Sequence, residues 1–274
     1  MEKGGVVVDG KLCTAAEALA DVRAGAHVAV HFWGLSGTPG CLLRALAETG
    51  VKDLTLYSNN FLPIPQGLRQ AGFPDPTTLL PQMEKLVTAF LGTRVFSGMG
   101  GDFLGDRVRS GQLEVEMTTH GVLMERLHAG AMGLGGFYSP IGLDTIVSKG
   151  KERRIIGGTE YLLEEPIRPD VGLIRAFRAD KLGNLVYRGT ARGSNPIIAM
   201  ASKFTIAEVQ EVVEPGDLDP EAVVTPGVYV DRIVRIPDDD ISNTRRSPEF
   251  RERIRMLAAM RAAAAAGPNG RARP

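Results

Sequence analysis

Short apolar runs that end in glycine-rich or polar turns recur along this chain. Residues 28–33 form one such β-rich run, and residues 34–39 form the glycine-containing turn behind it. Leucines at helical spacing follow the turn, at Leu42, Leu43 and Leu46. The order of strand, glycine turn and helix predicts a βα unit.

The same alternation continues to about residue 237. Further strands are predicted at 54–57, 86–91, 113–117, 171–177, 185–187, 204–213 and 229–236, and helices at 121–129 and 196–202. Parallel strands need crossover connections, which place helices on both faces of the sheet. We therefore predict an α/β fold with a mostly parallel sheet flanked by helices.

The alternation breaks at residues 237–240, where a proline is followed by three aspartates. We expect one domain over residues 1–237 and a C-terminal extension over residues 238–274. Within the extension, an apolar face predicts a short amphipathic helix at about 248–264, formed by Phe250, Ile254 and Leu257. The final residues, 267–274, are expected to be disordered.

Composition and charge indicate the cellular compartment and the kinds of partner to expect. The 274 residues include two cysteines, too few for a disulfide framework or a cysteine-rich zinc site, so we expect a reducing, cytoplasmic compartment. We find no secretory signal and no apolar run of about 18 residues, so we expect no membrane partner. Residues 245–274 hold eight Arg and two Glu. Without interleaved aromatics this basic tail favours a solvated or partner-docked extension over a nucleic-acid arm.

The first two predicted strands end where ligands gather in open α/β sheets. Gly34 and Gly37 let the backbone approach a ligand closely, and the helix behind them favours negative charge at its N-terminus. Asn59 and Asn60 follow the second strand and can donate hydrogen bonds to an acyl oxygen or a carboxylate. Ordinary tight turns explain the same residues, so both interpretations stay open.

A second polar group surrounds a Thr-Thr-His-Gly turn. Glu114 and Glu116 share one face of the preceding strand, and His120 lies in the turn. An imidazole with a near-neutral pKa can act as an acid, a base or a donor, although a purely structural histidine is the alternative. Walker, G-x-S-x-G, H-E-x-x-H and complete G-x-G-x-x-G motifs are absent, so we expect no metal and no permanently bound cofactor.

Many segments between residues 14 and 236 carry recognisable motifs in a fixed order. They are Trp-Gly-Leu-Ser-Gly-Thr-Pro at 33–39, and the segments 50–55, 58–60, 110–116, 121–136, 137–140, 179–180, 183–187, 191–192, 195–196, 213–218 and 225–227. In this order they resemble the α subunit of the 3-oxoacid and acetoacetate CoA-transferase family (CoA-transferase family I).

The resemblance implies a NagB/RpiA/CoA-transferase-like fold and an enzyme that transfers CoA between carboxylic acids, with a coenzyme A thioester as substrate. The nucleophile of this family is a glutamate in a Glu-Asn-Gly motif of the β subunit, which becomes a glutamyl-CoA intermediate. No Glu-Asn-Gly occurs in these 274 residues. We therefore expect a β-subunit partner, in an α2β2 heterotetramer, that supplies the carboxylate.

The resemblance also indicates the site. Asn59 matches the first Asn of a family Ser-Asn-Asn, and His120 stands where the family has the Gln of Thr-Pro-Gln-Gly. With the neighbouring Glu116, these are the expected catalytic residues. The expected substrate-binding residues are His31, Phe32, Trp33, Gly34, Gly37, Asn60 and Phe61.

The sequence departs from the family pattern in three places: His31-Phe32 replace Gly-Gly, His120 replaces Gln, and Asp144 replaces Gly. A titratable imidazole in place of an amide adds a possible acid or base. The alternative function is therefore a recruited relative that decarboxylates or hydrolyses an acyl-CoA with His120 as acid/base. A non-enzymatic ligand-binding module is a third possibility, which the continuous match to a catalytic subunit disfavours.

Overall fold

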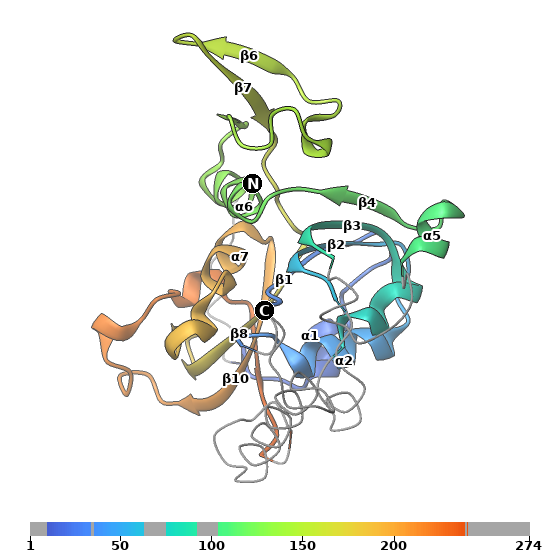
Figure 1. Ribbon diagram of the computed structural model, residues 1–274. Helices are drawn as coiled ribbons and strands as arrows, with labels where there is room; N and C mark the ends of the chain where they lie inside the picture. The colour runs from blue at the N-terminus through green and yellow to red at the C-terminus, as the bar shows by residue number, and fades with distance from the viewer. Residues whose placement is uncertain (1–9, 34–35, 63–74, 92–103, 239, 241–274) are drawn as a thin grey trace, which may run out of the picture. The chain divides into compact units, whose positions relative to one another are not determined.

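The computed structural model describes residues 10–33, 36–62, 75–91, 104–238 and 240 (Figure 1). The chain divides into two units, Met1–Ile236 and Pro237–Pro274. The predicted helix at about 248–264 and the predicted disordered end lie outside the described residues. The assignment of 1–237 as the functional domain stays a prediction.

The helices and strands follow one another along the chain in a mixed order. They are α1 (Ala15–Leu19), β1 (His27–Val30), α2 (Gly40–Thr49), β2 (Leu54–Asn60), the 3-10 helix η1 (Pro76–Gln82), β3 (Met83–Phe90), α5 (Gly105–Arg109), β4 (Glu114–Met117), α6 (His120–Met132), β5 (Phe137–Ser139), η2 (Ile146–Ser148), β6 (Arg153–Ile156), β7 (Thr159–Glu164), β8 (Val171–Asp180), β9 (Leu185–Val186), η3 (Gly189–Arg192), α7 (Asn195–Ala201), β10 (Phe204–Val213), η4 (Pro220–Ala222), η5 (Gly227–Tyr229) and β11 (Arg232–Arg235).

The main sheet has the strand order β11-β10-β8-β1-β2-β3-β4. All neighbours along this path are parallel, and β9 pairs antiparallel with β8. The predicted α/β fold with a mostly parallel sheet flanked by helices is confirmed. Short apolar strands buried on both faces produce this arrangement, because each face needs a layer of helices to cover it.

Alternate residues of the strands pack into two separate hydrophobic cores. In β1, Val28 and Val30 pack into one core together with side chains of α1 and α2. Ala29, between them, packs into the other core with Leu123 and Leu127 of α6. Figure 1 shows α1 and α2 together and α6 and α7 together, and the two cores place these pairs on opposite faces of the sheet.

A second, antiparallel sheet of order β5-β7-β6 was not predicted from the sequence. β6 and β7 form a hairpin through Gly157 and Gly158, whose φ angles of 58° and 84° suit a tight turn with positive φ at both central residues. Asp144, which lies between β5 and β6, has φ 57° and pairs with Arg153 at 3.2 Å. A positive φ favours glycine, which is the residue that the family resemblance indicates at this position.

Candidate active site

A cavity of about 470 Å³ opens at the edge of the main sheet where β1 and β2 end. Parallel neighbours bring their carboxyl ends to one edge, so the residues after β1 meet the last residues of β2. The cavity is lined by His31, Trp33, Asn59, Met124, Thr190, Gly193, Ser194, Pro196 and Ile197. Three of the predicted site residues, His31, Trp33 and Asn59, are therefore brought together, from segments on different strands.

Asn59, Ser194 and His31 form a buried chain of hydrogen bonds on the cavity wall. The Ser194 hydroxyl lies 2.8 Å from Oδ1 of Asn59 and 2.7 Å from Nδ1 of His31. On the other side of the ring, Nε2 lies 3.0 Å from the carbonyl oxygen of Ser36. Because a carbonyl only accepts, Nε2 carries a proton. Burial lowers the pKa of His31 and outweighs the hydrogen bonds to Ser36 and Asn59 that raise it.

Gly193 provides the space for this imidazole. Its φ is +41°, and a Cβ at this position would lie 2.3 Å from Cε1 of His31. Gly193 and Ser194 fall between the matched segments 191–192 and 195–196, so the motif comparison passed over them. The one available signal was that His31 replaces a glycine, since a ring added there needs space and polar partners elsewhere.

The part of the predicted glycine loop that contains Gly37 packs closely against the segment that precedes α7. Gly37 has φ +70°, and a Cβ there would lie 2.3 Å from the carbonyl oxygen of Ala191. The fully buried Asn195 donates through Nδ2 to the carbonyl oxygens of Gly37 and Ala191, at 3.1 and 3.0 Å. Gly37 thus serves close packing of two loops. Gly34 lies outside the described residues.

The N-terminus of α2 already has an anion. Glu208 of β10 is fully buried and accepts hydrogen bonds from the backbone N–H groups of Gly40 and Leu42, each at 3.0 Å. Arg175 of β8 balances this carboxylate at 3.2 Å. The expectation that this helix end favours negative charge from a ligand was wrong, because a protein carboxylate from a distant strand occupies it.

His120 lies in a separate polar group beside the cavity. It begins α6, and its Nε2 is 2.9 Å from Oδ1 of Asn60. Its ring meets Trp33 edge to face, with ring centroids 5.2 Å apart. Trp33 also lines the Asn59 cavity and is 54% exposed, so this indole links the two groups.

Glu116 lies in an ion-pair cluster. Its carboxylate is 2.6 Å from Arg126 and 3.0 Å from Lys85, and no hydrogen bond joins it to His120 in the described part of the chain. Burial alone would raise the pKa of Glu116, but Arg126 and Lys85 together lower it. A carboxylate held between two cations is a weak base, which favours a supporting role for Glu116.

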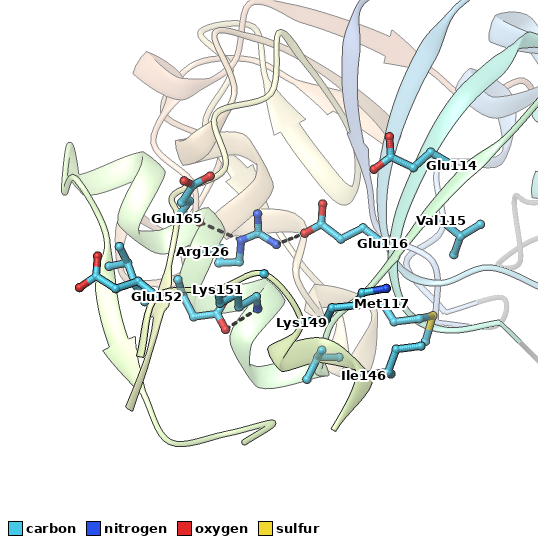
Figure 2. Close-up of a pocket in the computed structure, with 14 residues that line it drawn as sticks. Glu114, Val115, Glu116, Met117, Arg126, Ile146, Lys149, Lys151, Glu152 and Glu165 are labelled. Carbon is cyan, nitrogen blue, oxygen red and sulfur yellow. Dashed lines mark hydrogen bonds and ion pairs between the residues drawn. The ribbon is translucent and has the colours of Figure 1, made fainter. Parts of the chain in front are cut away.

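This cluster borders a second cavity of about 770 Å³, shown in Figure 2. There Arg126 lies between the Glu116 carboxylate and the backbone oxygen of Glu165. Lys151 contacts one oxygen of the buried Glu164 at 2.6 Å, while the other oxygen has no hydrogen-bond partner among the described residues. Two ion pairs, Glu116–Arg126 and Lys151–Glu164, join charged side chains that line this cavity, whereas the wall around Asn59 is mainly apolar.

Phe32 and Phe61 lie beneath the site. They are 1% and 0% exposed, and neither lines the Asn59 cavity. Phe61 packs in the core formed with α1 and α2. These two predicted substrate-binding residues are therefore buried side chains that pack behind the ends of the strands. The apolar wall of the cavity is formed by Trp33, Met124, Pro196 and Ile197.

Within the described ranges, no group of three or more His, Cys, Asp or Glu side chains is arranged to hold a metal ion. Among the helices that the structure describes, none has the length and apolar character to cross a membrane.

Comparisons with known proteins indicate the family of this chain. The family model described as coenzyme A transferase matches residues 13–235. The A-type subunit of a probable succinyl-CoA:3-ketoacid coenzyme A transferase from Bacillus subtilis is 42% identical, over 74% of this chain and 79% of its own length. The alpha subunit of the acetate CoA-transferase of Escherichia coli is 39% identical, over 82% of this chain and 96% of its own.

Solved structures share the fold. A variant of the decarboxylase AibA/AibB superposes with a TM-score of 0.68 at 26% identity, covering 93% of this chain and 94% of that chain. The acyl-CoA transferase YdiF of E. coli O157:H7 superposes with a TM-score of 0.69 at 21% identity. That match covers 83% of this chain and 47% of YdiF, so this chain spans about half of the YdiF chain.

Proposed function

This chain belongs to the coenzyme A transferase family, and we propose that its Asn59 cavity holds the acyl group of a CoA thioester. The chain is an α-type subunit of a CoA-transferase, an enzyme that moves CoA between carboxylic acids. Its relatives are named as A or alpha subunits, which supports a β-type partner. We propose an α2β2 assembly in the cytoplasm, with CoA thioesters as substrates and no permanently bound cofactor.

One observation carries the proposal for the site. Asn59 is 6% exposed, lines the cavity, and has Oδ1 held by Ser194. Its Nδ2 points to the sulfur of Met124 at 3.9 Å, a weak acceptor that a substrate oxygen can replace. An N–H donor held in this orientation suits an oxygen that gains negative charge during the reaction.

The partner's glutamate would complete the reaction. Its carboxylate attacks the thioester carbonyl, the carbonyl oxygen gains negative charge, and the Asn59 amide stabilises that charge. The thiolate of CoA leaves, which gives a mixed anhydride between the acyl group and the glutamate. The thiolate then attacks the glutamyl carbonyl and releases the first acid as its carboxylate, which gives the glutamyl-CoA intermediate. The second carboxylate passes through the same steps in reverse order, takes CoA and frees the glutamate. An uncharged donor is sufficient for these steps, since no proton has to move to or from Asn59.

The remaining site residues have graded roles in this proposal. Trp33 forms part of the acyl pocket, and Asn60 with His120 orders its exposed side. Glu116 acts through Arg126, which fixes α6. The relatives differ in the acid that they are named for, namely 3-ketoacid, acetate and 3-oxoadipate. We favour a 3-oxoacid as one substrate and transfer over decarboxylation, because the closer relatives are named transferases.

The test compares the chain alone with the chain co-expressed with its β-type partner, in an assay of CoA transfer from succinyl-CoA to acetoacetate. The single chain should be inactive. In the complex, Asn59→Ala should lower kcat about 100-fold or more with an unchanged melting temperature, while the exposed Ser110→Ala serves as the control. Turnover by the single chain, or full activity of Asn59→Ala, would overturn the proposal.

A further inference from the structure

We propose that Ser194 and His31 are positioning residues that decide which end of the Asn59 amide faces the acyl site. The proposal rests on the proposed function, because Asn59 matters for catalysis only if it contacts the acyl oxygen. Ser194 and His31 are not required to touch the reacting atoms. They act through the hydrogen bonds that orient the amide.

The three side chains are enclosed. Asn59, Ser194 and His31 are 6%, 7% and 2% exposed. Buried donors and acceptors must satisfy each other when water is excluded, so the direction of one hydrogen bond constrains the next. The chain of bonds ends at the Ser36 carbonyl, which fixes a proton on Nε2 of His31 in either charge state.

A neutral ring turns the chain of hydrogen bonds one way. Nδ1 is then an acceptor and takes the single hydroxyl proton of Ser194. The backbone N–H of Ser194, 3.3 Å from Nδ1, also favours this state. Two oxygens would now face each other between Ser194 and Asn59, so the amide is expected to turn its NH2 group toward Ser194. Its oxygen then faces the cavity.

A charged ring reverses these bonds. Nδ1–H donates to Ser194, and the Ser194 hydroxyl donates to Oδ1 of Asn59 at 2.8 Å. The amide NH2 then faces the Met124 side of the cavity, as in this structure. Only this state presents an N–H to an oxygen that gains negative charge.

The coupling acts in both directions. The hydrogen bond with Asn59 raises the pKa of His31, although burial is the larger effect and lowers it. A bound carboxylate that accepts the Asn59 N–H must therefore favour the charged ring. The elements around His31 also carry the solvent-exposed Arg188 and Arg192, His120 beyond Trp33, and the buried Arg175–Glu208 pair, whose Arg175 contacts the carbonyl oxygen of Thr38 at 3.4 Å.

The experiment follows two signals by NMR in the full chain bound to its β-type partner. The His31 ring and the Asn59 side-chain NH2 group should change with one shared midpoint as pH varies around the histidine range. In Ser194→Ala, His31 should still titrate while the Asn59 signal no longer follows it. The kcat of Ser194→Ala should fall at least about tenfold. The change in kcat with pH that follows the titration of His31 should be lost in this variant.

Ser202→Ala is the matched control. Ser202 is a second buried serine at the other end of α7, and its hydroxyl donates to the carbonyl oxygen of Ile198. This variant should keep the shared midpoint. Ser194→Thr keeps a hydroxyl and should restore the coupling.

Separate midpoints in the unmodified complex, or coupling that persists in Ser194→Ala, would overturn the proposal. If Ser194→Ala does not fold, the titration of the unmodified complex decides alone. If the two signals are coupled but Asn59→Ala keeps full activity, the orientation of Asn59 by Ser194 and His31 is supported and the proposed function is refuted instead.

Discussion

Replacing Gly193 by alanine tests how tightly the His31 ring is packed. The new Cβ would lie 2.3 Å from Cε1, 2.7 Å from Nε2 and 3.0 Å from Nδ1 of the imidazole. Such approaches are shorter than real Cβ contacts, so the ring or the loop must move. His31 is bonded at both ring nitrogens, and any shift of the ring breaks its contact with Ser194 or with Ser36.

The expected size of the effect combines two costs. A residue other than glycine at φ +41° costs about 1–3 kcal/mol. An extra methyl group forced into a packed interior costs about 1–3 kcal/mol more. Gly193→Ala should therefore lower the free energy of unfolding by roughly 2–6 kcal/mol. CoA transfer should fall as well, because a displaced imidazole no longer orients Ser194.

Urea unfolding separates the two costs with a matched control. Gly189 is four residues earlier and has φ +55°, and among the described residues, its two chain neighbours aside, no atom lies within 4 Å of the position of an added Cβ. Gly189→Ala therefore measures the cost of a positive φ without a steric clash. In a His31→Ala background the clash disappears, so the double variant should be more stable than the sum of the single effects predicts, by about 1–3 kcal/mol.

Equal destabilisation by Gly193→Ala and Gly189→Ala would refute the claim that Gly193 makes room for the ring. So would additive effects of His31→Ala and Gly193→Ala. Either result would mean that the ring has space to move, and that the short hydrogen bonds alone define its position.

Two charge changes give further expectations. Burial lowers the pKa of His31 in the folded chain, so as pH falls below about 6.5 the histidine of the unfolded chain takes up a proton first. The free energy of unfolding therefore decreases with falling pH until the pKa of the folded state is passed. In urea unfolding at several pH values, His31→Gln should lack this decrease. Arg126→Met leaves the 31%-exposed Glu116 with Lys85 alone and should cost about 2–3 kcal/mol in the same assay. Arg109→Met, which breaks an exposed pair with Asp106, should cost less than about 1 kcal/mol, and equal effects would contradict the account of Arg126.

The main sheet was predictable because its signals are local. The predicted strand at 204–213 coincides with β10, and the predicted helix at 121–129 lies inside α6. The small sheet was not predicted from the sequence because β6 is exposed along its whole length. A strand without a buried face leaves no alternation of apolar and polar residues to detect. Its remaining signal was the Gly157-Gly158 pair, which is typical of a tight hairpin turn.

The site was predictable only as far as the sheet edge. His31 follows β1 and Asn59 lies at the end of β2, and the carboxyl ends of these neighbouring parallel strands meet at one edge of the sheet, which brings the two residues together. Ser194 is 163 residues from His31, and its approach depends on β8 lying next to β1 with α7 returning over that pair. The sequence pattern does not determine that strand order. The imidazole at 31 occupies volume that a side chain at 193 would need, and it requires a hydroxyl or a similar partner at 194. The position of the His31 ring therefore depends on the residues at 193 and 194, and a sequence pattern that judges each position alone misses this dependence.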